Sequence, residues 1–303
     1  FRRAANLLKL LRSIEAVRVP EHCELRVLIV DNDSNRSAEA VVRRFAQSAR
    51  FPVSYEVEPK QGISFARNRL LHLVSGDYAL FIDDDETASP DWLINLLEVQ
   101  RKHDADVVFG PVVSIFEEPA PEWIVRHPIF RRIQRESGTL LPHGASNNVL
   151  LRSSTTLDRG ISFDGAFAKT GGEDTHFFYQ LRESGAKLVW CDTAEVFEHV
   201  PHSRARLSWM LRRSFRGGQS FARLLYTKNG WCKRKSWMTW KFAQALLGCL
   251  CLPLAFLVSP HVAAALLTKV CAALGQATAC LSSRFLYAEY GGKGYEVGAG
   301  GPS

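Results

Sequence analysis

Apolar and polar positions alternate along the first two hundred residues in short segments whose periods predict strands and helices in turn. Apolar runs too short for helices predict strands at residues 26–30, 53–57, 78–82, 106–109 and 148–151, with short extended pieces at 189–191 and 195–197. Helical spacing predicts helices at residues 7–14, 38–49, 64–73, about 90–103 and 173–183. Strands that alternate with helices of this length indicate an α/β fold. We expect a mixed, mostly parallel sheet with helices on both faces.

The pattern changes twice further along the chain. Residues 111–142 are rich in proline and predicted to be irregular, and from about Ser203 arginine becomes frequent. Lysines, an arginine and tryptophans occupy residues 231–241, followed by apolar runs at 245–258 and 262–281. Each run is at or below the ~20 residues that a membrane-spanning helix needs.

Basic and aromatic residues before an apolar helical pair favour a membrane-surface anchor, with a buried helical hairpin of a soluble domain as the alternative. We therefore expect three parts: a catalytic domain over residues 1–205, a basic and then apolar helical segment over 206–290, and a disordered tail over 291–303.

Charge and cysteine content narrow the class of protein. The 303 residues carry a formal charge of +7, which predicts an anionic partner such as a phosphorylated substrate, an anionic lipid surface or nucleic acid. The seven cysteines form no CxxC pair and no cluster with zinc spacing, which predicts reduced thiols in a reducing compartment. The chain begins at Phe1 within a helical pattern and shows no signal peptide, so we expect residues to precede it.

Three adjacent aspartates follow the predicted strand at residues 78–82. Asp83, Asp84 and Asp85 would lie at the carboxyl end of that strand, where open α/β sheets bind their ligands. Carboxylates this close repel one another unless a cation neutralises them. A solvated acidic turn is the simpler interpretation, but the position at a strand end favours a metal site.

Two other classes of protein compete for these features. FIDDDET matches the first motif of haloacid-dehalogenase-like phosphatases, where Asp83 would be the phosphorylated nucleophile and Asp85 the general acid. That mechanism needs a downstream strand ending in Gly-Asp, and the candidate VWCDTAEVFEH lacks it. A basic nucleic-acid-binding protein would explain the charge but not the carboxylates, and no recognised nucleic-acid motif occurs, so we expect no nucleic acid.

A set of six segments carries a resemblance to a known family. LRVLIVDNDS, KQGISFARN, YALFIDDDETASPDWL, GASNNVLLR, FDGAFAKTGGEDTHFFYQLRESGAKLVW and EHV occur in order over about residues 4–201. Their order and spacing resemble family 2 glycosyltransferases of the GT-A fold, particularly bacterial members that extend exopolysaccharide repeat units on a lipid carrier. The resemblance implies an inverting transfer of sugar from a nucleoside-diphosphate donor, with a UDP-sugar favoured, to a glycan or lipid-linked acceptor. It also implies a divalent cation, Mn²⁺ or Mg²⁺, and a cytoplasmic location at the inner face of the plasma membrane.

The resemblance further implies roles for individual residues on the donor side. Asp83 and Asp85 match the family's metal-and-ribose motif, with Asp85 the direct ligand, and His199 lies where many relatives keep a histidine near the metal or diphosphate. The residues expected to bind the donor are Asp31, Asn32, Gly62, Arg67, Asn68, Asp83 and Asp84. Many relatives have an aspartate in place of Asn32, whose amide can still bind a base edge through its donor and its acceptor.

On the acceptor side the reaction needs a general base, because the attacking hydroxyl must lose a proton. Glu173 and Asp174 match the family's Glu-Asp motif, and Asp174 resembles its catalytic base. The simpler explanation of this pair is favourable charge at a helix N-terminus. A cluster of three arginines could bind the diphosphate of donor or acceptor, or lipid headgroups: Arg212, Arg213 and Arg216.

The chain also departs from the family's pattern at its start. Members begin with an apolar strand that ends near Thr-Tyr-Asn-Arg or Thr-Phe-Arg-Arg, and residues 1–3 look like the tail of that motif. We therefore expect the first central strand to be missing from this chain, and nucleotide binding to be weaker without it.

Overall fold

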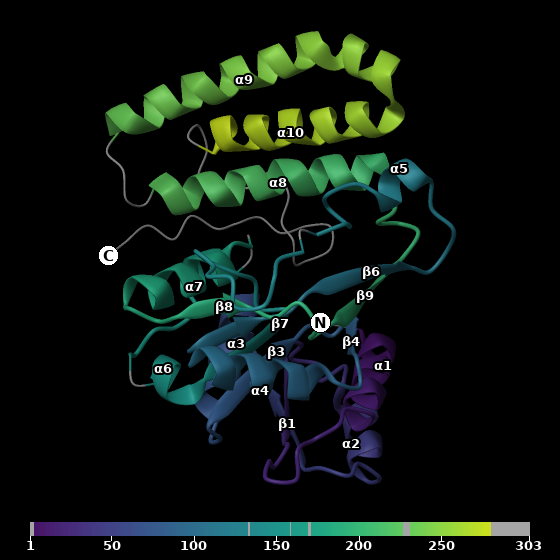
Figure 1. Cartoon of the computed structure of the whole chain (residues 1–303), viewed down its shortest axis with the longest axis vertical. Helices are drawn as coiled ribbons and strands as arrows, with labels where there is room; N and C mark the ends of the chain where they lie inside the picture. The colour runs from purple at the N-terminus through teal and green to yellow at the C-terminus, as the bar shows by residue number, and fades with distance from the viewer. Residues whose placement is uncertain (1–2, 133, 158, 169–170, 227–230, 280–303) are drawn as a thin grey trace. The chain divides into compact units, whose positions relative to one another are not determined.

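The computed structural model describes residues 3–132, 134–157, 159–168, 171–226 and 231–279 (Figure 1). The chain divides into two compact units. The first comprises Phe1–Glu118, Phe130–Ala168 and Glu173–Pro201, and the second comprises Pro119–Ile129, Lys169–Gly172 and His202–Ser303.

The first unit contains strands and helices in alternation. Its helices are α1 (Ala4–Glu15), α2 (Glu39–Ala46), α3 (Ile63–Leu73), α4 (Trp92–His103), α6 (Ser153–Leu157) and α7 (Glu173–Glu183), with a 3₁₀ turn at Gly165–Phe167. Its strands are β1 (Val27–Asp31), β2 (Val53–Val57), β3 (Tyr78–Ile82), β4 (Glu86–Ala88), β5 (Val107–Phe109), β6 (Val112–Phe116), β7 (Asn148–Arg152), β8 (Leu188–Trp190) and β9 (Val196–Val200).

The strands form a mixed α/β architecture, as the sequence predicts. The orders are β1-β2, β3-β7-β5-β8 and β4-β9-β6. Three pairs are parallel, β1 with β2, β5 with β8 and β6 with β9, while β7 runs antiparallel to both β3 and β5, and β4 antiparallel to β9. Parallel pairing is therefore less dominant than we expected. β7 follows a long connection after β6, and a connection of that length permits either strand direction.

Helices cover both faces of the four-stranded sheet, as predicted. Leu150 of β7 packs in one apolar cluster with residues of α1 and α4, whereas its neighbours Val149 and Leu151 pack in the other with Phe177 and Phe178 of α7. Successive side chains of a strand point to opposite faces, so the two clusters must lie on opposite sides of the sheet.

The structure corrects several boundaries. The predicted irregular segment 111–142 contains β6 and the short helix α5 (Glu122–Val125), and β4 was not predicted. Helix α4 begins at Trp92 with Asp91 as its N-cap, not at Pro90 after Ser89. The extended chain continues past β4, since the Ser89 N–H donates to Glu195 O at 3.1 Å, and the helix begins three residues after Ser89.

The second unit is helical in its described part. It contains α5, α8 (Leu207–Tyr226), α9 (Trp231–Val258) and α10 (Pro260–Thr278), with α10 between α8 and α9 (Figure 1). Glycines bring α8 and α10 together: a Cβ on Gly218 would lie 2.1 Å from Ala272 O, and one on Gly275 would lie 2.0 Å from Phe215 O. Within the described residues, one segment, Lys235–Val258, is long and apolar enough to cross a membrane by length and composition. The end of the second predicted apolar run and the predicted disordered tail lie outside the described residues.

Candidate active site

The acidic turn between β3 and β4 is bound by an arginine that the sequence analysis gave no role. One guanidinium nitrogen of Arg3, at the start of α1, lies 2.8 Å from Asp85 Oδ2 and 3.1 Å from Asp84 Oδ1. Asp85 is the more enclosed of the two carboxylates, 13% exposed against 34% for Asp84. The turn thus holds one cationic side chain between two carboxylates.

The pKa of the Asp83 carboxyl reflects the concentration of negative charge around this turn. The surrounding protein atoms are the largest influence: they reduce the hydration of the Asp83 carboxyl, whose side chain is still 41% exposed, and raise its pKa to about 6. Arg67 acts in the opposite direction, and Asp85, Asp84 and Asp174 raise the pKa further. Asp174, the predicted base, is among the charges that act on Asp83 although it lies far along the chain. A positive charge brought here would relieve repulsion among several carboxylates at once.

A buried ion pair connects the acidic turn to the start of α7. Arg67 of α3 pairs with Glu173, with both side chains less than a tenth exposed, and its other terminal nitrogen lies 3.5 Å from Asp83 Oδ1. Its guanidinium also lies over the Phe163 ring, 5.6 Å from the centroid. Asp174 follows Glu173 directly, so this ion pair fixes the backbone just before the predicted base. Asp174 Oδ1 accepts the N–H of Thr175 at 2.7 Å.

Next to Asp83, the acid Glu86 is buried in β4. It accepts the Asp83 N–H at 3.2 Å and the side-chain amide of Asn147 at 2.9 Å. Burial, and then the nearby Asp83, raise the pKa of Glu86 well above its ordinary value. Glu86 therefore stabilises the backbone of the acidic turn from its buried side. In the sequence Glu86 stands out only as part of FIDDDET, and no local signal marks it as buried, because β4 is too short to show a strand pattern.

His199 lies in β9, whose pairing with β4 brings it beside the turn. The backbone N–H of His199 donates to Asp85 O at 3.3 Å, and the imidazole Nε2 lies 3.4 Å from Thr87 Oγ1. The structure thus places the predicted histidine next to Asp85 through the backbone. Within the residues that the structure describes, no group of three or more His, Cys, Asp and Glu side chains is gathered closely enough to hold a metal by itself.

The two polar residues at the end of β1 are occupied by contacts within the protein. Asp31 is buried and accepts the N–H groups of Asp33 and Ala38 at 3.0 and 2.9 Å, and the Tyr55 hydroxyl at 2.9 Å. Burial, and then the hydrogen bond to Asp31, raise the pKa of Tyr55. Asp31 is thereby fixed at the carboxyl end of the strand.

Asn32 fastens the loop that leads to α3. Its amide nitrogen donates to Glu58 O and Lys60 O, both at 2.8 Å, and its oxygen accepts the Gly62 N–H at 2.8 Å. The sequence suggested that this amide could bind a base edge. In the structure its two N–H groups and its oxygen are already used to shape the loop.

The start of α3 is in turn tied to the segment before α7. Gly62 has φ +139°, and a Cβ there would lie 2.5 Å from Ala168 Cβ, so only glycine fits. The Ile63 N–H donates to Ala168 O at 3.0 Å. Asn68 exchanges two 2.8 Å hydrogen bonds with the backbone of Phe163. These predicted donor-binding residues therefore position the loops around the acidic turn.

The three arginines predicted to bind diphosphate or lipid lie on α8, in the second unit. The Arg213 guanidinium is 5.2 Å from the centroid of the Trp209 ring, and Arg212 Nε donates to Ser208 O at 3.2 Å. Arg216 is half-buried on the same helix. Their role stays a prediction.

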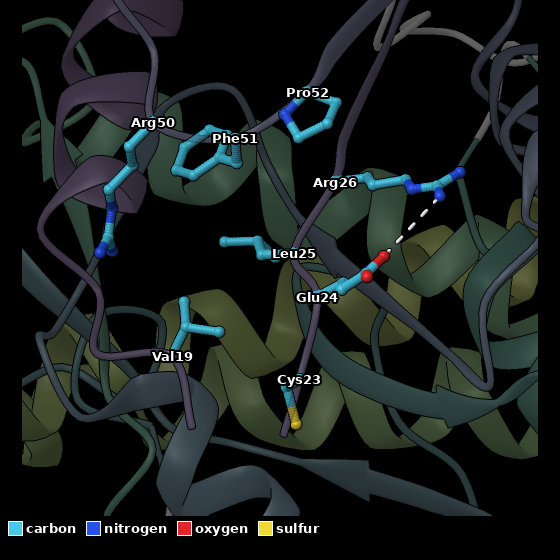
Figure 2. A pocket seen from close by; sticks show the side chains of 8 residues that line it. All are labelled: Val19, Cys23, Glu24, Leu25, Arg26, Arg50, Phe51 and Pro52. Atoms are coloured by element: carbon cyan, nitrogen blue, oxygen red, sulfur yellow. Dashed lines mark ion pairs between the residues drawn. The ribbon is translucent and has the colours of Figure 1, made fainter. Parts of the chain in front are cut away.

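A pocket of about 370 Å³ opens at the other end of β1 and β2 (Figure 2). Its lining comes from the segments that enter the two strands: Val19, Cys23, Glu24, Leu25, Arg26, Arg50, Phe51 and Pro52. Ligands of open α/β sheets bind at the carboxyl ends of strands, whereas this pocket lies at the amino ends. It is therefore separate from the acidic turn.

The bonds of Asn32 lead to a prediction about stability. In Asn32→Asp, a carboxylate would face the Glu58 and Lys60 carbonyl oxygens with no hydrogen to donate. We expect a loss of about 1–3 kcal/mol in the free energy of unfolding, measured by urea denaturation. Asn35→Asp, an exposed change of the same chemistry, is the matched control and should have little effect. Equal stability of the two variants would show that the loop does not depend on the Asn32 amide.

Comparison with known proteins shows first the class of fold and then the family. The structure is similar to a mannosyltransferase from Pyrobaculum calidifontis, PcManGT, in complex with GDP-Man and Mn²⁺, with TM-score 0.58, 18% identity, and coverage of 92% of this chain and 71% of that chain. It is also similar to S. aureus TarS 1–349 in complex with UDP-GlcNAc, with TM-score 0.52, 16% identity, and coverage of 74% and 69%. The fold is thus the GT-A glycosyltransferase fold.

Sequence comparison gives the family. The model of glycosyl transferase family 2 matches residues 1–156. The succinoglycan biosynthesis protein ExoM of Rhizobium meliloti is 38% identical over 226 residues, 75% of this chain and 73% of that protein. A glucosyl-dolichyl phosphate glucuronosyltransferase of Haloferax volcanii is 26% identical over 54% of this chain and 56% of that protein. The chain belongs to glycosyl transferase family 2, and it is a glycosyltransferase.

Proposed function

We propose that this glycosyltransferase moves a sugar, with inversion, from a nucleoside-diphosphate donor to a glycan or lipid-linked saccharide during surface polysaccharide biosynthesis. The observation that carries the proposal is the link between the acidic turn of Asp83 and Asp85 and the start of α7, where Arg67 contacts both Asp83 and Glu173, the residue before Asp174. The similarity to a succinoglycan biosynthesis protein supports the polysaccharide context. A UDP-sugar is the favoured donor.

The acidic turn suits a divalent cation by its chemistry. Its donors are carboxylate oxygens, which Mg²⁺ and Mn²⁺ prefer, and one or two carboxylates suffice where substrate phosphates supply other ligands. Asp85, with Asp83 beside it, would hold the ion, and His199 lies next to Asp85. A cation bound there would offset the negative charge that develops on the diphosphate as it leaves.

The protein's own residues divide the remaining work. Asp31 and Asn32 shape the end of β1, where the nucleoside would bind, and Gly62 and Asn68 hold the adjoining loops. Asp84 shares Arg3 with Asp85. Asp174 accepts the proton of the attacking acceptor hydroxyl. Glu173, which is held by its ion pair with Arg67, orients Asp174.

The acceptor is expected at the inner face of the plasma membrane, with the enzyme cytoplasmic and in contact with the membrane surface. The basic and apolar helices of the second unit support this location. On α8, Arg212, Arg213 and Arg216 are proposed to contact a diphosphate or lipid headgroups.

A screen of nucleotide sugars tests the proposed function. Thermal shift should reveal one donor that stabilises the protein in Mn²⁺ and barely does so in chelator. With that donor and a membrane extract holding lipid-linked saccharides, radiolabelled sugar should enter the lipid fraction with release of the nucleoside diphosphate. If no nucleotide sugar shifts the melting temperature in the presence of a divalent ion, the proposal is wrong.

Arg3 leads to a second prediction, which concerns metal affinity alone. Because its guanidinium lies between Asp84 and Asp85, it competes with any cation that approaches the two carboxylates. Arg3→Gln should therefore bind Mn²⁺ several-fold more tightly in calorimetry without nucleotide. Arg12→Gln removes the same charge from an exposed position of α1 and should leave the affinity unchanged. Weaker binding by Arg3→Gln would show that Arg3 supports the metal site instead of competing with it.

A further inference from the structure

The outward face of α9 is apolar over several turns. Leu250, Leu254 and Leu257 are 69%, 65% and 84% exposed, and by helical spacing the exposed Leu246, Leu247 and Val258 lie on the same side. The opposite side of the helix, with Ala245 buried and Gly248 in contact with Val270, packs on α10. A contiguous apolar surface of this kind indicates an interaction site.

The first turns of α9 carry residue types that favour a lipid interface. Trp240 is 64% exposed, and Lys235 is exposed one turn before it. Lys241 lies over the ring of Trp237, with its ammonium 4.8 Å from the centroid. Tryptophans settle at the headgroup level, and lysines are attracted to anionic headgroups. An anionic bilayer fits this combination better than a protein surface, because it complements both the apolar face and the basic end.

The packing of the three long helices restricts how α9 can meet a bilayer. α10 lies between α8 and α9 (Figure 1). Its backbone approaches that of α8 so closely that Gly218 and Gly275 leave no room for a side chain. If α9 stood upright across the bilayer, α10 and α8 would therefore stand beside it at the same depth.

An upright arrangement would carry the charges of α8 into the hydrocarbon. This helix has four arginines, Arg212, Arg213, Arg216 and Arg223. Charged side chains at membrane depth are strongly disfavoured. If α9 instead lies flat, its outward face enters the lipid, α10 lies behind it, and α8 is the layer farthest from the hydrocarbon. The flat arrangement buries the apolar face and leaves the arginines in water, so of their two proposed partners it favours a diphosphate over lipid headgroups.

We propose that α9 lies parallel to the membrane plane in one leaflet of an anionic bilayer and does not span it, so that the second unit is a monotopic anchor. This inference deepens the membrane contact of the proposed function and rests on it. The length and composition of α9 alone would also permit a span.

Three probe positions on the outward face distinguish the two arrangements. Ala243, Leu250 and Leu257 follow one another at seven-residue spacing and are all exposed. Single cysteines at these positions, in a chain whose other cysteines except buried Cys191 are replaced by alanine, are labelled with an environment-sensitive fluorophore. Depth in phosphatidylglycerol-containing vesicles is measured by quenching with lipids spin-labelled at different carbons. Flat binding should give three equal, shallow depths, whereas an upright helix should give depths that differ by roughly 10 Å per seven residues.

Two glutamates placed on the outward face of α9 test the role of that face through the affinity for vesicles. Leu250→Glu with Leu254→Glu should weaken vesicle binding at least about tenfold, since two exposed leucines no longer enter lipid. The matched control, Gln47→Glu with Gln180→Glu, adds the same charge at exposed positions of the first unit and should change binding little.

Each other outcome overturns the inference in a recognisable way. Unequal depths would establish a spanning helix. A soluble dimer that ignores vesicles, and that the double glutamate variant dissociates, would assign the face to a second copy of the chain. Donor-dependent thermal shift is measured on the same samples, so that a failed anchor with an intact donor response overturns this inference alone, and loss of the donor response in the wild-type chain overturns the proposed function.

Discussion

Asp85→Asn is expected to abolish sugar transfer and to remove the Mn²⁺-dependent part of nucleotide binding. Asp85 is the most enclosed carboxylate of the acidic turn. Its side chain pairs with Arg3, and its backbone oxygen accepts the backbone N–H of His199. The amide retains the shape but loses the charge that a hard divalent cation requires. Calorimetry with the donor nucleotide, in Mn²⁺ and in chelator, should show a large loss of affinity only with the metal.

The control for this prediction lies at the other end of the same strand. Asp77→Asn makes the same chemical change at an exposed position just before β3 and should leave transfer and binding intact. Melting temperatures of both variants show whether folding is preserved, since Arg3 keeps Asp84 as a partner in Asp85→Asn. If Asp85→Asn retains most of its transfer activity, the metal is not held by this residue.

The sequence predicts best those elements whose signal is local. β2, β3 and α7 begin and end where the pattern of apolar residues places them, because each is a single uninterrupted run. β4 and β6 escaped prediction because their order comes from pairing with β9, more than eighty residues away in the chain. Three residues at 86–88 carry too few side chains to show a period of two.

The direction of β7 could not be read from the sequence either. A strand's own residues are the same for parallel and antiparallel neighbours, and β7 was correctly located near residues 148–151. Its antiparallel pairing follows from the path of the preceding connection, which the predicted irregular segment did not define. Short strand-to-helix connections elsewhere made the parallel prediction reasonable, and they do produce the β1–β2 pair.

In the candidate site, too, local motifs were visible in the sequence and long-range contacts were not. The acidic turn and the Glu-Asp pair were found because each is a compact motif. The contacts that bring them together were not, since Arg67 and Glu173 lie 106 residues apart and no local pattern pairs them. Asn32 was expected to face a ligand, but the structure uses it to hold a loop 26–30 residues further on. The motifs thus supplied the candidate residues, and long-range packing determines which of those candidates lie together.

Asp174→Asn is the change expected to separate catalysis from donor binding. Transfer should fall by roughly 10²–10⁴, the usual contribution of a positioned general base, while donor affinity stays within a few-fold. The asparagine keeps an oxygen that can accept the Thr175 N–H, so the start of α7 should lose only the favourable charge at its N-terminus, about 0.3–1 kcal/mol. Single-turnover transfer at saturating donor measures the chemical step.

Two further variants of the same helix show whether the effect belongs to the base. Glu183→Gln, at the exposed far end of α7, should change neither rate nor stability. Glu173→Gln breaks the buried pair with Arg67 and should cost up to about 3 kcal/mol of stability, because the guanidinium then keeps Asp83, which is more exposed, as its counter-charge. Its transfer rate, measured well below its melting temperature, should fall less than that of Asp174→Asn. If Asp174→Asn transfers sugar at near the wild-type rate, the proton goes to another residue, and the side chains that face the acidic turn, beginning with Asp83, are the next to be changed.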